Sequence, residues 1–107
     1  MAGWKIENSL DVLVRALCLD YSRRERAIAE RSVTHRTDTE FRYYNFKIFD
    51  AVAEVVGESH AEIYIKEIGE CIGYAKSELG LTLSEITYKK RKRFAMDNVA
   101  RRLHLCD

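Results

Sequence analysis

Proline is absent from the chain of 107 residues, although average usage of about 5% would supply about five prolines. Because proline is the strongest helix breaker and only five glycines are present, few residues interrupt helices. The apolar share of 47% and the charged share of 33% exclude a disordered or collagenous chain. The composition predicts a single helical domain over residues 1–107.

Long apolar runs are missing as well. No run approaches the roughly 18 apolar residues of a membrane span, and the start MAGWKIENSL lacks the pattern of a secretory signal. The cysteines Cys18, Cys71 and Cys106 form no Cys-x-x-Cys pair, which argues against a disulfide framework and against a zinc site. We therefore expect a cytoplasmic protein with free thiols, no metal, no cofactor and no membrane partner.

A recognisable catalytic arrangement is also missing. The acidic pairs Glu58/Glu62 and Glu67/Glu70 lie at helical spacing, but no histidine or glycine-rich phosphate loop accompanies them. Such pairs are usually solvated partners of lysines. Because no nucleophile, base and orienting group stand together, we expect neither an enzyme nor a small-molecule substrate.

Four segments repeat apolar residues at the spacing of an α-helix. The first is expected as one long helix over residues 6–31, with Leu10, Leu13, Leu17 and Tyr21 buried; a restart at Ser22 is the alternative. The others are expected over residues 37–57, over residues 59–79 or with a break near Gly73, and over residues 83–103. With no strand candidate, the pattern predicts an all-α bundle of four helices, within a range of three to five.

The second of these helices is apolar on nearly all sides. Such a helix lies at the centre of its domain or is shared with a partner subunit. We expect it to be the least exposed helix, to end at Gly57 and to carry a homodimer interface at Phe41, Tyr44, Phe46 and Phe49.

Charge is unevenly distributed, although the formal net charge is only +1. Residues 1–47 hold nine basic and seven acidic residues, residues 48–80 hold two and seven, and residues 81–107 hold seven and three. Five of the last bases are consecutive, Lys89-Lys90-Arg91-Lys92-Arg93. This run is a candidate patch for phosphate or another acidic surface, and a solvated helix face is the alternative.

The last two expected helices resemble a helix-turn-helix, with a glycine turn before a basic helix. Either Gly73 or Gly80 can serve as the turn. We prefer Gly80, because this register lets Ser84 cap a helix that exposes Glu85, Thr87, Lys89 and Arg91.

The segment IKEIGECIGYAKS at residues 65–77 resembles the first helix and turn of region 4 of bacterial sigma factors and of sigma-like phage or mobile-element regulators. ITYKKRKR at residues 86–93 is similar to their basic reading helix, and VARRL at residues 99–103 is similar to its end. The resemblance implies a small DNA-binding transcriptional regulator.

Two hypotheses of function result. In the first, the protein binds double-stranded DNA, reading bases with Thr87 and with Lys89 or Arg91, and contacting phosphates through Lys89, Lys90, Arg91, Arg93, Arg101 and Arg102. In the second, it is a non-enzymatic, dimeric protein–protein interaction module without DNA binding, whose partner site is the apolar surface over residues 41–56. The first hypothesis requires the C-terminal bases and the arginines of residues 23–31 to share one accessible face.

Overall fold

The computed structural model describes the backbone of residues 2–105 and the side chains of residues 9–105. Within this part of the chain there is no strand, and the all-α fold is confirmed. The elements are α1 (Ala2–Leu19), α2 (Tyr21–Glu30), α3 (His35–Val56), α4 (Glu58–Gly69), the 3-10 helix η1 (Tyr74–Lys76) and α5 (Glu85–Arg102).

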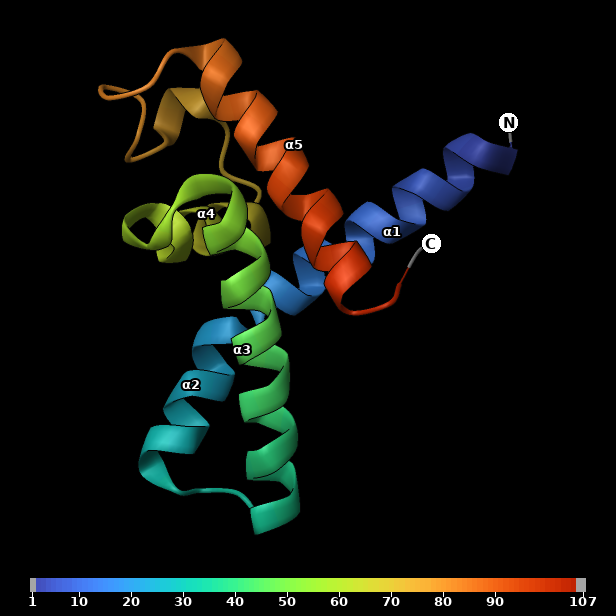
Figure 1. Ribbon diagram of the computed structural model, residues 1–107, viewed down its shortest axis with the longest axis vertical. Coiled ribbons are helices and arrows are strands. Elements are labelled where there is room, and N and C mark those ends of the chain that lie inside the picture. Colours follow the sequence, from blue (N-terminus) through green and yellow to red (C-terminus); the bar gives the residue numbers. More distant parts are fainter. Residues whose placement is uncertain (1, 106–107) are drawn as a thin grey trace.

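Helix α3 is the central element, and it packs against α2, α4 and α5 (Figure 1). Its C-terminal half supplies the core residues Ile48, Ala51 and Val52, which are fully buried. Its N-terminal half pairs with α2 in an antiparallel hairpin that projects at one end of the molecule. The loop that contains η1 and the start of α5 lie at the other end.

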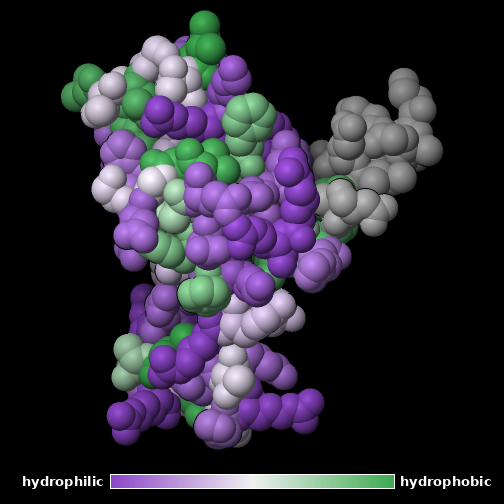
Figure 2. Space-filling view, viewed as in Figure 1, coloured by the Kyte–Doolittle hydropathy of each residue, from purple (hydrophilic) through white to green (hydrophobic). Residues whose placement is uncertain are grey.

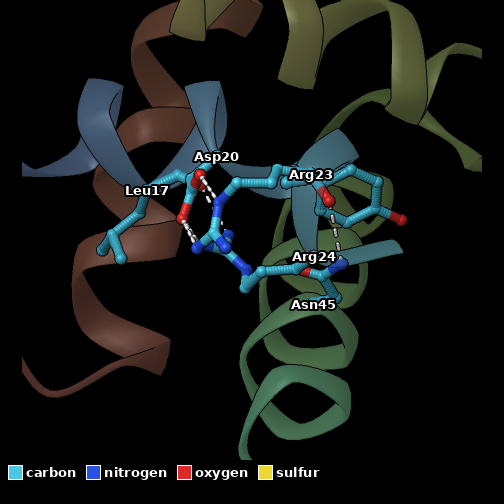
Figure 3. Close-up of polar contacts among 6 residues, drawn as sticks. Leu17, Asp20, Arg23, Arg24 and Asn45 are labelled. Atoms are coloured by element: carbon cyan, nitrogen blue, oxygen red, sulfur yellow. Dashed lines mark hydrogen bonds and ion pairs between the residues drawn. The ribbon is translucent and has the colours of Figure 1, made fainter. Parts of the chain in front are cut away.

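The expected long helix over residues 6–31 is wrong, because the chain breaks at Asp20 between α1 and α2. The break turns α2 along α3, and the buried Arg24 donates from Nη2 to the carbonyl of Leu17 at 2.6 Å. Figure 3 shows this guanidinium between α1, Asp20 and Asn45. The buried apolar side chains of this region are Val14, Cys18 and Tyr21. Of the other residues expected to be buried, Leu10 and Leu17 are half-buried and Leu13 is exposed.

Helix α3 begins two residues before the expected start, since Thr34 caps it and accepts a hydrogen bond from the Thr37 amide at 3.3 Å. Gly57 ends it with a φ of 88°, as predicted. The prediction that this helix is the least exposed holds only for its C-terminal half. Its N-terminal half remains open to solvent because α2 is the one neighbouring helix there.

Helix α4 ends at Gly69, ten residues before the expected end at residue 79. Residues 70–84 instead form a loop around η1, and Ser84 then caps α5 by accepting from the Thr87 amide at 3.2 Å. A helix-turn-helix joins its helices by about three or four residues. Neither the Gly73 nor the Gly80 register therefore forms a tight turn between two α-helices.

Candidate interaction surfaces

Two of the predicted DNA-contacting arginines form ion pairs between helices. Arg93 donates from both terminal nitrogens to Asp11, at 2.7 and 3.0 Å, and thereby joins α5 to α1. Its hydrogen bond and its charge lower the pKa of the Asp11 carboxyl below the ordinary value. Arg102 donates to Asp50 at 2.7 Å and also to Glu54, which joins α5 to α3. These two arginines are occupied by carboxylates of the protein itself.

Two further predicted residues take part in local contacts at the start of α5. The Thr87 amide and hydroxyl both bond to the capping Ser84 side chain. Lys89 pairs with Glu85 one turn earlier, with 2.7 Å between Nζ and Oε2. Both partners of this pair are exposed, so the pair contributes little stability and leaves Lys89 accessible.

The basic run also contains one residue that points inward. Lys92 donates from Nζ to the carbonyl of Ile72 at 2.6 Å and lies 5.5 Å from the centre of the Tyr88 ring. Burial lowers the pKa of this lysine. Lys92 therefore fastens the loop to α5 and was not distinguishable from its basic neighbours in the sequence.

Three predicted cations, Lys90, Arg91 and Arg101, form no ion pair with any residue that the structure describes. Two of the three arginines of α2 are engaged within the protein. Arg24 is only 4% exposed, and Arg23 pairs with Asp20 at 2.5 Å. Helix α2 and the start of α5 also lie toward opposite ends of the molecule (Figure 1). Phosphate contacts would therefore rest on the cations of α5.

The four predicted interface residues divide into two pairs. Tyr44 and Phe46 are exposed, whereas Phe41 lies half-buried under the Arg23 guanidinium at 5.3 Å and Phe49 packs against the core. Tyr43 belongs to the same apolar arc but was not among the four predicted interface residues. It is exposed and contacts the Tyr44 ring edge-on, with 5.6 Å between the ring centroids. Its position in the run of aromatics between Phe41 and Phe49 could have indicated that it belongs to the same surface.

A hollow of about 320 Å³ lies between α2 and α3. Its apolar lining comes from Tyr21, Ile28, Phe46 and Phe49, and its polar lining includes Glu25 and Arg42. We call it the hairpin hollow. The hollow could not be predicted from one long helix over residues 6–31, because such a helix would not fold back along α3.

The described residues contain no group of three histidine, cysteine, aspartate or glutamate side chains suited to a metal ion. Among them, Cys18 is a buried free thiol and Cys71 an exposed one, while the predicted thiol of Cys106 lies outside the described residues. No described helix combines the length and the apolar character needed to cross a membrane. Comparison with known proteins finds no matching family model, curated protein or solved structure.

Proposed function

We propose that the protein is a non-enzymatic helical module that binds protein, and that it forms a homodimer in the cytoplasm. The observation that carries this proposal is the aromatic surface of the projecting hairpin. Tyr43, Tyr44 and Phe46 are 49%, 41% and 68% exposed, and Phe46 also lines the hairpin hollow. Adjacent exposed aromatics with a hollow are typical of protein interfaces, in which tyrosine and phenylalanine are enriched.

The internal packing of the domain supports this assignment. The core is filled by the C-terminal half of α3 together with α4 and α5, through residues such as Ile48, Ile65 and Val99. The exposed aromatics add little to that core. An exposed apolar surface that lowers solubility and does not contribute to the core is expected where a partner covers it.

Sedimentation equilibrium tests the proposal. Wild-type protein should dimerise, and Phe46→Ser should weaken the dimer by roughly tenfold or more, because truncating a buried interface aromatic costs more than about 1 kcal/mol. Val12→Ser is the matched control, since Val12 is 61% exposed, close to the value for Phe46, but lies on α1. A wild-type protein that stays monomeric at high concentration contradicts the homodimer, and an unchanged Phe46→Ser dimer contradicts this surface.

DNA binding is a second candidate function, favoured by the three cations without an ion pair. Lys90, Arg91 and Arg101 are available to phosphates, and Thr87 lies in the first turn of the same helix. Three contacts predict a slope of log affinity against log salt of about −2.7, which is gentler than a six-contact site would give.

Fluorescence anisotropy with a mixed-sequence duplex at about 50 mM salt, where phosphate contacts are strong, tests this candidate. Replacing Lys90, Arg91 and Arg101 together by alanine should remove binding. The control is replacement of Lys47, a cation on α3 beside the Tyr43 ring. Absence of binding by the wild-type protein eliminates the DNA candidate.

A further inference from the structure

The end of the molecule opposite the hairpin carries protruding aliphatic side chains. Leu81, in the loop before α5, is fully exposed, and Ile86, in the first turn of α5, is 81% exposed. Figure 2 shows hydrophobic side chains among hydrophilic ones at this end. We call Leu81, Ile86, Lys89 and Lys90 the basic tip.

The basic tip is held in place by the loop beneath it. The Tyr74 hydroxyl lies 2.9 Å from the carbonyl oxygen of Gly80 and 2.7 Å from that of Leu83, on either side of Leu81. Leu79 is buried in the core two residues before. Because its backbone is fixed, Leu81 is presented outward in one position, and binding through it costs little conformational entropy.

Charge surrounds these aliphatic side chains. Lys89 and Lys90 follow Ile86 by three and four residues and therefore lie on its side of α5. Both lysines are exposed. A surface that complements the basic tip must offer an apolar hollow beside carboxylates.

The hairpin hollow of this same chain has that chemistry. Ile28, Phe46 and Phe49 supply its apolar lining, and Glu25 supplies a carboxylate. Arg42 also lines the hollow, but its charge is paired with Asp38 at 2.7 Å. Glu62 of α4 lies on the other side of Tyr21, where it lines the neighbouring hollow. Neither carboxylate forms an ion pair with a described residue. Tyr21 lines both hollows and so lies between the two carboxylates.

One copy of the protein cannot join these two surfaces. The basic tip and the projecting hairpin lie toward opposite ends of a molecule 42 Å long (Figure 1). Two copies side by side and antiparallel bring each tip to the hairpin of the other copy. Such an arrangement has two-fold symmetry and forms the same contact twice.

We propose that the occupant of the hairpin hollow is the basic tip of a second copy, with Leu81 and Ile86 against its apolar lining and Lys89 and Lys90 facing Glu25 and Glu62. This inference rests on the proposed homodimer and specifies its geometry. It differs from a dimer in which the aromatic surfaces of two hairpins meet each other.

Charge reversal on the two surfaces tests the proposal. Glu25→Lys with Glu62→Lys should abolish the homodimer, and so should Lys89→Glu with Lys90→Glu, because each change brings like charges together. Mixing the two double variants should restore a dimer, since each tip then meets a hollow of opposite charge. Sedimentation velocity with one variant fluorescently labelled detects the mixed dimer. A mixture that stays monomeric overturns the proposal, as does either double variant that dimerises as the wild type does.

A second pair of variants tests the apolar part of the contact. Leu81→Ser should weaken the dimer by about a hundredfold or more, because the loss expected for one buried leucine, about tenfold to a hundredfold, is incurred at both contacts. Leu19→Ser is the matched control on an exposed leucine of α1. Circular dichroism confirms that each variant is folded. If Leu81→Ser dimerises normally while Phe46→Ser does not, this geometry fails and the proposed function stands. A monomeric wild type removes both.

Discussion

Gly69 of α4 lies directly against the backbone of Leu19 at the end of α1. A Cβ atom at position 69 would come within 2.5 Å of the Leu19 nitrogen and 2.6 Å of its Cα. Gly73 differs, because no atom lies within 4 Å of the place that its Cβ would take. Only the first glycine allows two helices to approach each other.

Gly69→Ala should destabilise the protein by about 1–3 kcal/mol, the usual cost of overpacking, because the backbone of α1 must move away. Gly73→Ala should be neutral or stabilise by up to about 1 kcal/mol, since alanine accepts its extended backbone and restricts the unfolded chain. Urea denaturation followed by circular dichroism measures both. Equal effects of the two substitutions would contradict the close approach at Gly69.

Two neighbouring arginines should differ sharply when each is changed to methionine. Arg24→Met leaves the buried Asn45 oxygen and the Leu17 carbonyl without their donor, which should cost about 2–3 kcal/mol. Arg23→Met removes an exposed ion pair with Asp20 and a contact with the Phe41 ring, and it should cost about 1 kcal/mol or less. The midpoints of thermal unfolding should separate the two variants. If they coincide, the Arg24 hydrogen bonds do not stabilise the α1–α2 break.

Glu67→Gln should loosen the loop over residues 70–84. The buried Glu67 carboxylate accepts from the Ser77 hydroxyl at 2.6 Å, the Tyr88 hydroxyl at 2.7 Å and the Glu78 amide at 3.0 Å. Glutamine replaces one acceptor oxygen by a donor group, which should cost about 1–3 kcal/mol.

Hydrogen exchange of the Glu78 amide gives the local measure of this change. Its protection should fall in Glu67→Gln and remain unchanged in Glu70→Gln, where the substituted side chain is exposed. Unaltered protection in Glu67→Gln would show that the loop is held by other contacts.

Stability should decline in acid through the pair of Asp11 and Arg93. The hydrogen bond from Arg93 holds the pKa of Asp11 below its ordinary value of 3.8. The folded state therefore binds this proton less readily than the unfolded state, and the stabilisation is complete above the ordinary pKa and disappears as the pH falls through the folded one. Urea titrations between about pH 5 and pH 2 should show a shallower decline for Asp11→Asn. An unchanged slope would contradict the assignment.

Features that depend on a few neighbouring residues were predictable from the sequence. The end of α3 at Gly57 and the cap of α5 at Ser84 belong to this group. The break at Asp20 and the end of α4 at Gly69 were not, because Arg24 reaches Asn45 across 21 residues and Gly69 meets Leu19 across the fold.

The residues of the candidate sites were likewise predictable only where neighbouring residues determine their environment. Exposure of Tyr44 and Phe46 accords with the apolar excess of their helix, which local spacing reveals. The ion pairs of Arg93 and Arg102 could not be predicted, since their carboxylate partners lie 82 and 52 residues away in sequence. A basic run has no local signal that separates cations held inside the protein from cations left for a ligand.

The loop over residues 70–84 is ordered by contacts with α4 and α5, which must pack together first. Glu67 from α4 and Tyr88 from α5 meet above it, and η1 is too short to form alone. We expect these residues to become ordered after the folding transition state, so that substitutions in the loop change the unfolding rate more than the folding rate. Leu81 would then take its outward position only in the fully folded protein. A chain in which this loop alone unfolds would lose the proposed contact with a second copy while its core stays folded.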